Sequence, residues 1–241
     1  MKIAHNRYLF YLTVLFAIWW IVLAIAPTYR QDWALENVFV AAGIMFIAAT
    51  YKKIPFSRIS YTLIFLFLCL HVLGAHYTYA ETPYDAWSQH LFGFSLNELM
   101  GFQRNHYDRF IHFAYGFLLA YPIRELFIRV ASVKGFWGYF LPVVLTMASS
   151  MTFELFEWAA ALVFGGDLGI AYLGTQGDVW DAQKDMALAS FGAIIAMTVT
   201  ASVNINLQRD FAKEWNESLK VKGTQPLGED KLIKMWKSRK Q

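Results

Sequence analysis

The chain has 241 residues, of which 57% are hydrophobic, 18% aromatic and only 16% charged. A soluble domain of this length usually carries about 25% charged residues, and the deficit here falls in long uncharged runs, so the composition excludes an ordinary soluble domain. The formal net charge of +3 is small and gives no indication of a nucleic-acid partner. The single cysteine, Cys69, lies in an apolar run and has no partner for an intramolecular disulfide.

Six segments are predicted to cross a membrane as α-helices. A hydrocarbon core about 30 Å thick requires roughly 20 helical residues. The segments, in chain order, are residues 8–26, 33–51, 59–80, 107–128, 135–164 and 186–207. The fifth is longer than one crossing requires, so either Pro142 kinks it or its last residues, 158–164, turn along the membrane surface. The sequence therefore predicts an all-α transmembrane bundle over residues 1–207.

Two segments are predicted to lie outside the hydrocarbon core. Residues 82–106 mix large apolar side chains such as Trp87, Leu91 and Phe92 with polar ones, a pattern typical of an amphipathic stretch at the membrane interface. Residues 208–241 are charged and contain Gly223, so we expect a partly helical, partly disordered cytoplasmic tail.

The distribution of basic residues predicts the orientation of the chain. The N-terminus, the second and fourth hinges between spans, and the tail together hold 17 of the 21 Lys and Arg residues. By the positive-inside rule both termini are expected in the cytoplasm of a bacterial inner membrane. A cleaved signal peptide ending near Ala26 is the alternative for the first segment, although its nineteen-residue apolar run exceeds the usual apolar region of about 7–15 residues.

Ionisable side chains of four spans are predicted to reach a similar depth on the extracytoplasmic side. Polar groups inside a membrane are costly, so their placement indicates function. Counting about 1.5 Å per helical residue brings together the following residues: His76, Asp108, His112, Glu154, Glu157, Asp178, Asp181 and Asp185.

Such a mixture of imidazole and carboxylate groups suits a divalent metal, with Zn, Mn, Fe and Mg all open. The predicted metal ligands are His76, His112, Glu154 and Asp181. The predicted supporting or catalytic groups are Asp108, Glu157 and Asp185. A bound metal would activate a water molecule and leave one carboxylate as general base.

Structural roles explain several of these residues equally well. Asp108 and Asp181 each open a helix, where the helix dipole favours an acidic side chain. Lys184 lies three residues from Asp181 and could pair with it. His71, beside Gly74, is interpreted as an interhelical hydrogen-bonding residue rather than a ligand.

Four stretches resemble the YjdF-type family of bacterial inner-membrane proteins. They are HVLGAHYTYAETPYDAW (71–87), RNHYDRFIHFAYGFLLAYPIRE (104–125), FELFEWAAALVFGGDLG (153–169) and YLGTQGDVWDAQKDMALASFGA (172–193). The resemblance covers about residues 8–205 and implies an inner-membrane location, while the family supplies no established activity. A more distant likeness to VanZ-like membrane proteins rests on an Asp-x-x-x-His helix start followed by a later Glu and a later Asp. The residues concerned are Asp108, His112, Glu154, and Asp181 or Asp185.

The sequence is compatible with three functions. The first is an intramembrane enzyme, a metal-dependent hydrolase or transferase acting on a membrane lipid or a lipid-linked envelope substrate. The second is a proton- or cation-coupled transporter, for which few polar residues continue through the inner half of the spans. The third is a membrane scaffold that uses the tail, residues 208–241. The sequence indicates no oligomeric state.

Overall fold

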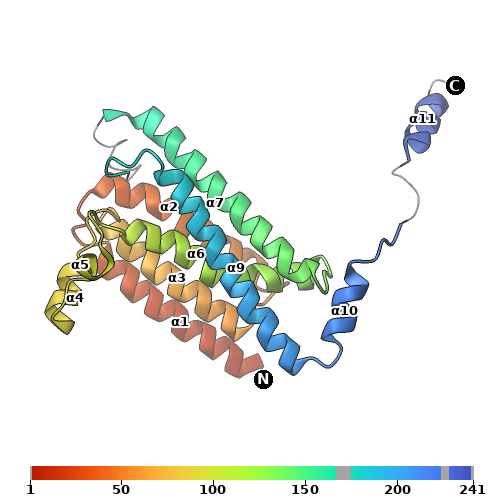
Figure 1. Cartoon of the computed structure of the whole chain (residues 1–241), viewed down its shortest axis with the longest axis horizontal. Coiled ribbons are helices and arrows are strands. Elements are labelled where there is room, and N and C mark those ends of the chain that lie inside the picture. The colour runs from red at the N-terminus through yellow and green to blue at the C-terminus, as the bar shows by residue number, and fades with distance from the viewer. Residues whose placement is uncertain (1, 167–174, 224–227, 240–241) are drawn as a thin grey trace.

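The structure is a bundle of long α-helices (Figure 1). It is a computed structural model that describes residues 2–166, 175–223 and 228–239, and over those residues it contains helices and no strands. The bundle consists of α1 (Lys2–Leu23), α2 (Arg30–Thr50), α3 (Arg58–His76), α6 (Tyr107–Val130), α7 (Trp137–Phe164) and α9 (Asp181–Leu207).

Five of the six predicted spans are long and apolar enough to cross a membrane, namely α1, α2, α3, α7 and α9. The remaining one, α6, has 24 residues, which is sufficient length, but it carries charged residues near both ends, including Asp108 and Glu125. The helices expose apolar side chains outward, as shown by Phe10, Leu15 and Ile18 of α1, each more than half exposed. This arrangement suits a lipid solvent, in which apolar surface need not be hidden.

The long helix α7 covers the fifth predicted span, for which the sequence left two conformations open. It runs without interruption from Trp137 to Phe164 and includes Pro142 within its first two turns. Residues 158–164 continue this helix rather than turning away from it. Helix α9 begins at Asp181, five residues before the predicted start, so both Asp181 and Asp185 belong to the helix.

Shorter helices lie at the two ends of the bundle. Helices α4 (Tyr84–Phe92) and α5 (Leu96–Met100) occupy the segment that was predicted to be interfacial. They expose Leu91, Phe92 and Leu99, which are suitable side chains for a membrane interface. After α9, the tail forms α10 (Phe211–Ser218) and α11 (Glu229–Ser238).

Helix α10 packs on the end of the bundle where α7 begins. Glu214 accepts a hydrogen bond from the Gly135 backbone N–H at 2.9 Å, and Ser218 accepts one from Phe136 N–H at 2.9 Å. The Trp215 ring lies 5.8 Å from that of Tyr139. The tail is therefore a helical part of the bundle over this stretch, and these contacts satisfy backbone groups at the start of α7 that have no partner within the helix.

Helix α6 lies in the middle of the bundle and contacts α3, α7 and α9 (Figure 1). Its approach to α9 depends on two glycines. A Cβ added at Gly116 would lie 1.8 Å from the Ala189 carbonyl oxygen, and one added at Gly192 would lie 2.3 Å from the Phe113 carbonyl oxygen. Small residues allow membrane helices to approach this closely because their backbones can touch.

We expect Gly116→Ala to destabilise the bundle, because the new methyl group forces α6 and α9 apart. Overpacking of this kind costs about 1–3 kcal/mol. The matched control is Gly43→Ala on α2, where an added Cβ meets nothing within 4 Å. Thermal unfolding in detergent should show a clear loss for Gly116→Ala and little change for Gly43→Ala. Equal melting temperatures for the two variants would contradict the close packing.

Candidate functional site

The candidate site lies at the end of the bundle where α6 and α9 begin and where α3 and α7 approach their C-termini; we call it the site end. His112, on the second turn of α6, is its centre. The His112 Nε2 atom lies 3.7 Å from Asp108 Oδ1 and 3.6 Å from Glu154 Oε1. Asp108 and His112 are four residues apart on one helix, so they share a face. Glu154 comes from α7, across the helix interface.

A third carboxylate reaches His112 from α9. One ligand atom each from Asp108, His112 and Asp185 lies within 4.8 Å of the others. The Asp185 side chain is 2% exposed, and its Oδ1 atom has no hydrogen-bond partner among the described residues. A buried carboxylate oxygen without a partner is costly. The geometry therefore provides one imidazole and two carboxylates for a cation.

Glu154 and Glu157 form a pair on α7. They are three residues apart, so their side chains share a helical face. Glu157 is buried, at 9% exposure. Glu154 Oε1, the atom nearest His112, has no hydrogen-bond partner among the described residues. Glu154 therefore places an oxygen that can accept a hydrogen bond or a proton beside His112.

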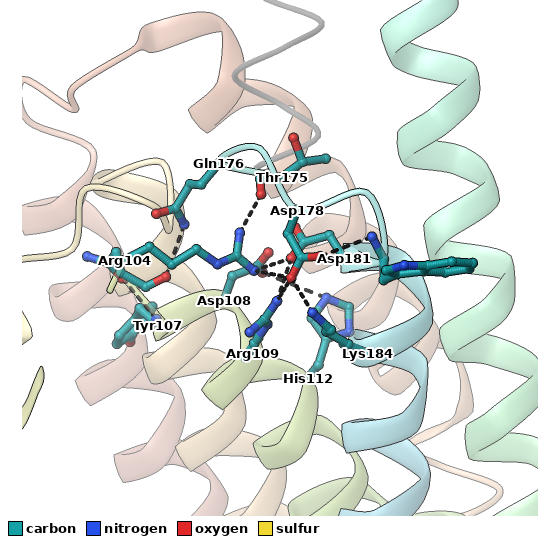
Figure 2. Close-up of polar contacts among 12 residues, drawn as sticks. Arg104, Tyr107, Asp108, Arg109, His112, Thr175, Gln176, Asp178, Asp181 and Lys184 are labelled. Carbon is teal, nitrogen blue, oxygen red and sulfur yellow. Dashed lines mark hydrogen bonds and ion pairs between the residues drawn. The ribbon is translucent and has the colours of Figure 1, made fainter. Parts of the chain in front are cut away.

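Asp181 has different neighbours from the rest of the cluster, as Figure 2 shows. Arg104 and Arg109 both contact Asp181 Oδ1, the latter at 3.3 Å. Arg109 also pairs with Asp178, which accepts a hydrogen bond from Lys184 Nζ at 2.5 Å. We call this group of five residues the arginine latch, because it ties the segment that precedes α9 to the start of α6.

The latch has two further supports outside the spans. Arg104 donates to the Thr175 carbonyl, and Gln176 donates to the Asn105 carbonyl at 3.0 Å (Figure 2). Hydrogen bonds from Lys184 and from the Trp180 backbone N–H hold the pKa of Asp178 well below its usual range. Asp178 is therefore ionised at neutral pH, and its negative charge attracts the three basic side chains of the arginine latch.

His76 lies apart from the cluster. Its Nδ1 atom is 2.8 Å from the Leu23 carbonyl oxygen, and its ring lies 4.5 Å from that of Tyr77. Four predicted site residues, Asp108, His112, Glu154 and Asp185, thus lie together. Glu157 adjoins them through Glu154, whereas Asp181 belongs to the latch and His76 joins α3 to the end of α1.

Three residues beside the cluster were given no role in the site from sequence. Glu36 of α2 is 4% exposed, and with His71 and Tyr79 it forms a hydrogen-bonded group. The sequence did contain a signal for Glu36: Asp32 and Glu36 are four residues apart and therefore share a helical face, and both are buried. Tyr79 had no such signal, because its position depends on the turn after α3.

An apolar cavity of about 660 Å³ opens from the cluster into the bundle. It lies among α2, α3, α6 and α7. The site end contributes the ionisable groups of its lining, which are His71, Tyr79, Asp108, His112 and Glu157, while Tyr115, Ser149, Ser150 and Thr152 add hydroxyl groups. Away from these residues the lining is largely apolar and includes Phe46, Ile47, Phe56, Leu119 and Leu126. The cavity therefore has one polar end and one long apolar part.

A helical bundle with five apolar spans and ionisable groups buried between its helices defines a multi-pass integral membrane protein. The chain matches the family described as "Predicted membrane protein (DUF2238)" over residues 8–206, and it belongs to that family. It is 36% identical over 183 residues to "Inner membrane protein YjdF" of Escherichia coli (strain K12), with 76% of this chain and 83% of that protein covered. No solved structure matches the chain.

These comparisons confirm the resemblance to YjdF-type proteins predicted from the four motifs. All four lie within the matched residues 8–206, and the charged tail lies outside them. The relative is an inner-membrane protein by its name, in agreement with the membrane location predicted from composition. The orientation of the termini remains a prediction.

We expect Asp181→Asn to destabilise the protein strongly, because it leaves two guanidinium groups facing only Asp178. Removing one partner of a buried ion pair costs about 3–5 kcal/mol. Lys184→Gln is the matched control, since the Lys184 side chain is 48% exposed and an exposed pair contributes about 0–1 kcal/mol. Melting temperatures in detergent compare the two variants. An unchanged melting temperature in Asp181→Asn, with loss of bound metal, would instead identify Asp181 as a metal ligand.

Proposed function

We propose that the protein is an intramembrane enzyme, a metal-dependent hydrolase or transferase whose substrate is an amphipathic lipid or lipid-linked envelope molecule. The observation that carries this proposal is the cavity, which joins a long apolar space to a cluster of imidazole and carboxylate groups. A single-chain amphiphile matches this division, with its tail in the apolar part and its polar head at His112. Ligand sites commonly combine an apolar lining with a few convergent polar groups.

The cation site that the geometry favours consists of Asp108, His112 and Asp185. One nitrogen and two oxygen donors suit Zn, Mn or Fe, and three protein ligands leave a position for water or substrate, as in catalytic zinc sites. Tetrahedral bonds of about 2.1 Å place ligand atoms about 3.4 Å apart. The ligand atoms must therefore move about an ångström closer together, by rotation of their side chains, to bind a metal. This set retains His112 from the predicted ligands and replaces His76, Glu154 and Asp181 with Asp108 and Asp185.

Glu154 is then available as the general base. It lies beside His112 on the neighbouring helix, 3.6 Å away, and its Oε1 atom has no hydrogen-bond partner among the described residues. A bound divalent cation would lower the pKa of a coordinated water and polarise the ester or phosphoryl oxygen of the lipid head. Glu154 would accept the proton of that water, with Glu157 beside it on the same helical face as a supporting carboxyl group.

The lining of the cavity favours an enzyme over a transporter. A path for protons or cations requires polar groups throughout the membrane, whereas Phe46, Phe56 and Leu126 line the apolar part. The buried carboxylates collect at the site end instead of forming a chain across the bundle. Under this proposal the site end faces the extracytoplasmic side of the inner membrane, and both termini are cytoplasmic.

We expect purified protein to contain about one divalent metal per chain, and we expect His112→Ala and Asp185→Asn to lose it. Each change removes one of the three donor groups. Elemental mass spectrometry of protein purified in detergent without chelators measures the metal content. His76→Ala is the matched control, because His76 lies against α1 and should leave the metal in place.

A loss of metal in His76→Ala with retention in Asp185→Asn would contradict this ligand set. Folded wild-type protein without metal would overturn the metal-dependent reaction itself. A melting curve for each variant separates loss of a ligand from loss of fold.

We also expect a large side chain placed in the cavity to exclude lipid. Gly43 lines the cavity, and a Cβ added there meets nothing within 4 Å, so Gly43→Trp has room to fill the space where the tail would lie. Native mass spectrometry should show co-purified single-chain amphiphile in wild type and its loss in Gly43→Trp. The matched control is Ile44→Trp, because Ile44 is the next residue of α2 and is exposed like Gly43, but it does not line the cavity. Equal lipid content in both variants would contradict the cavity as the lipid site.

A further inference from the structure

Tyr79 occupies an unusual position in the turn after α3. Thr78 and Tyr79 both have positive φ angles, 55° and 46°. This left-handed region is uncommon for residues other than glycine and is sterically unfavourable for them. Two such residues in succession fold the chain back, and the Tyr79 backbone N–H donates to the Gly74 carbonyl at 2.8 Å. Strain of this kind is concentrated at binding sites and active sites.

Gly74 provides the space that the Tyr79 ring occupies. A Cβ added at Gly74 would lie 2.5 Å from Tyr79 Cε1 and 3.0 Å from Tyr107 Cε1. Any larger residue would therefore displace the ring. The ring lies against α3 at this point, and its hydroxyl group reaches His71, three residues nearer the N-terminus of the helix.

The hydrogen bonds of His71 define the direction of the Tyr79 hydroxyl. His71 Nε2 lies 3.3 Å from the Glu36 carbonyl oxygen, which only accepts, so this nitrogen carries a hydrogen. In a neutral imidazole the other nitrogen is then an acceptor. Tyr79 Oη, 2.7 Å from His71 Nδ1, therefore donates to it. Glu36 Oε2 is a second acceptor for the same Tyr79 hydrogen, but it is more distant, at 3.4 Å.

Tyr79 is thus left with an oxygen that can accept. Its one hydrogen is directed to His71, and a phenolic oxygen retains lone pairs for another donor. Tyr79 and His71 both line the cavity, together with Asp108 and His112 of the proposed cation site. The polar end of the cavity therefore presents cation ligands from α6 and a fixed hydrogen-bond acceptor from the turn after α3.

We propose that Tyr79, held in place by Gly74 and His71, binds the ligand of the cavity by accepting a hydrogen bond from a hydroxyl group in its polar head. The ligand class is an amphiphile with a hydroxyl-bearing head. This inference rests on the proposed lipid substrate and makes it more specific. A site with a fixed polar partner discriminates against an analogue that lacks the matching hydroxyl, because the buried group is then left unpaired.

The test compares 1-dodecanol with its methyl ether, which replaces the hydroxyl hydrogen with a methyl group and so removes the donor. Each is titrated into detergent-purified full-length protein, and apparent affinity is obtained from the rise in melting temperature. Wild type should bind the alcohol roughly fivefold more tightly than the ether, as expected for one hydrogen bond. Tyr79→Phe should bind both equally, since Phe retains the ring against Gly74 and removes only the hydroxyl.

Tyr115→Phe is the matched control. Tyr115 also lines the cavity, but its hydroxyl lies 2.6 Å from Ser149 Oγ, so its loss should leave the preference for the alcohol unchanged. Tyr79 would lose its assigned role if wild type bound the two probes equally or if Tyr79→Phe kept the preference. Wild type that bound neither probe would overturn the lipid cavity as well. A purely structural role for Tyr79 would lower the melting temperature of the unliganded variant without changing the ratio of the two affinities.

Discussion

Burial of acidic side chains in a membrane is the constraint on which the architecture of the site end depends. Asp32, Glu36, Glu157, Asp181 and Asp185 are all less than a tenth exposed. Carboxylates in such surroundings must be paired, protonated or bound to a cation, because an isolated buried charge is very costly. The protein uses the first solution at an identifiable residue, because Asp181 is paired with the two arginines of the arginine latch. Asp185, with an unpartnered oxygen near His112 and Asp108, is the group for which the third solution is proposed.

Helix α6 connects these solutions to the rest of the bundle. One face is packed so closely on α9 that Gly116 and Gly192 admit no side chain, and this contact fixes the distance between His112 and Asp185. Another face borders the cavity, where Asp108 and His112 meet the apolar lining. The arginine latch holds the start of α6 to the start of α9 and so sets their register at the site end. Packing, ion pairing and the proposed chemistry thus depend on a single helix, which is also the most polar of the predicted spans.

The sequence alone predicted the helical class and most of the long helices, because uncharged runs and the length of a span are local properties. Counting residues from span ends also brought Asp108, His112, Glu154 and Asp185 to one level. Counting residues could not show in which direction each side chain at that level points. His76 faces α1, and Asp181 faces Arg104 and Arg109, which no pattern in the sequence links to the site. The position of Tyr79 could not be predicted from the sequence. It depends on two positive φ angles and on the space above Gly74, and a pattern of apolar residues shows neither. The cavity could not be predicted either, since its lining comes from four helices that are distant in sequence.

The most direct test of the central claim is to locate the cation. Crystals of the protein loaded with Mn²⁺, measured at a wavelength where manganese scatters anomalously, place the ion without reference to any activity. The proposed cation site predicts an anomalous peak among Asp108, His112 and Asp185, at the polar end of the cavity. A peak at Asp178 and Asp181 in place of the arginine contacts, or no peak in well-ordered crystals, would contradict it.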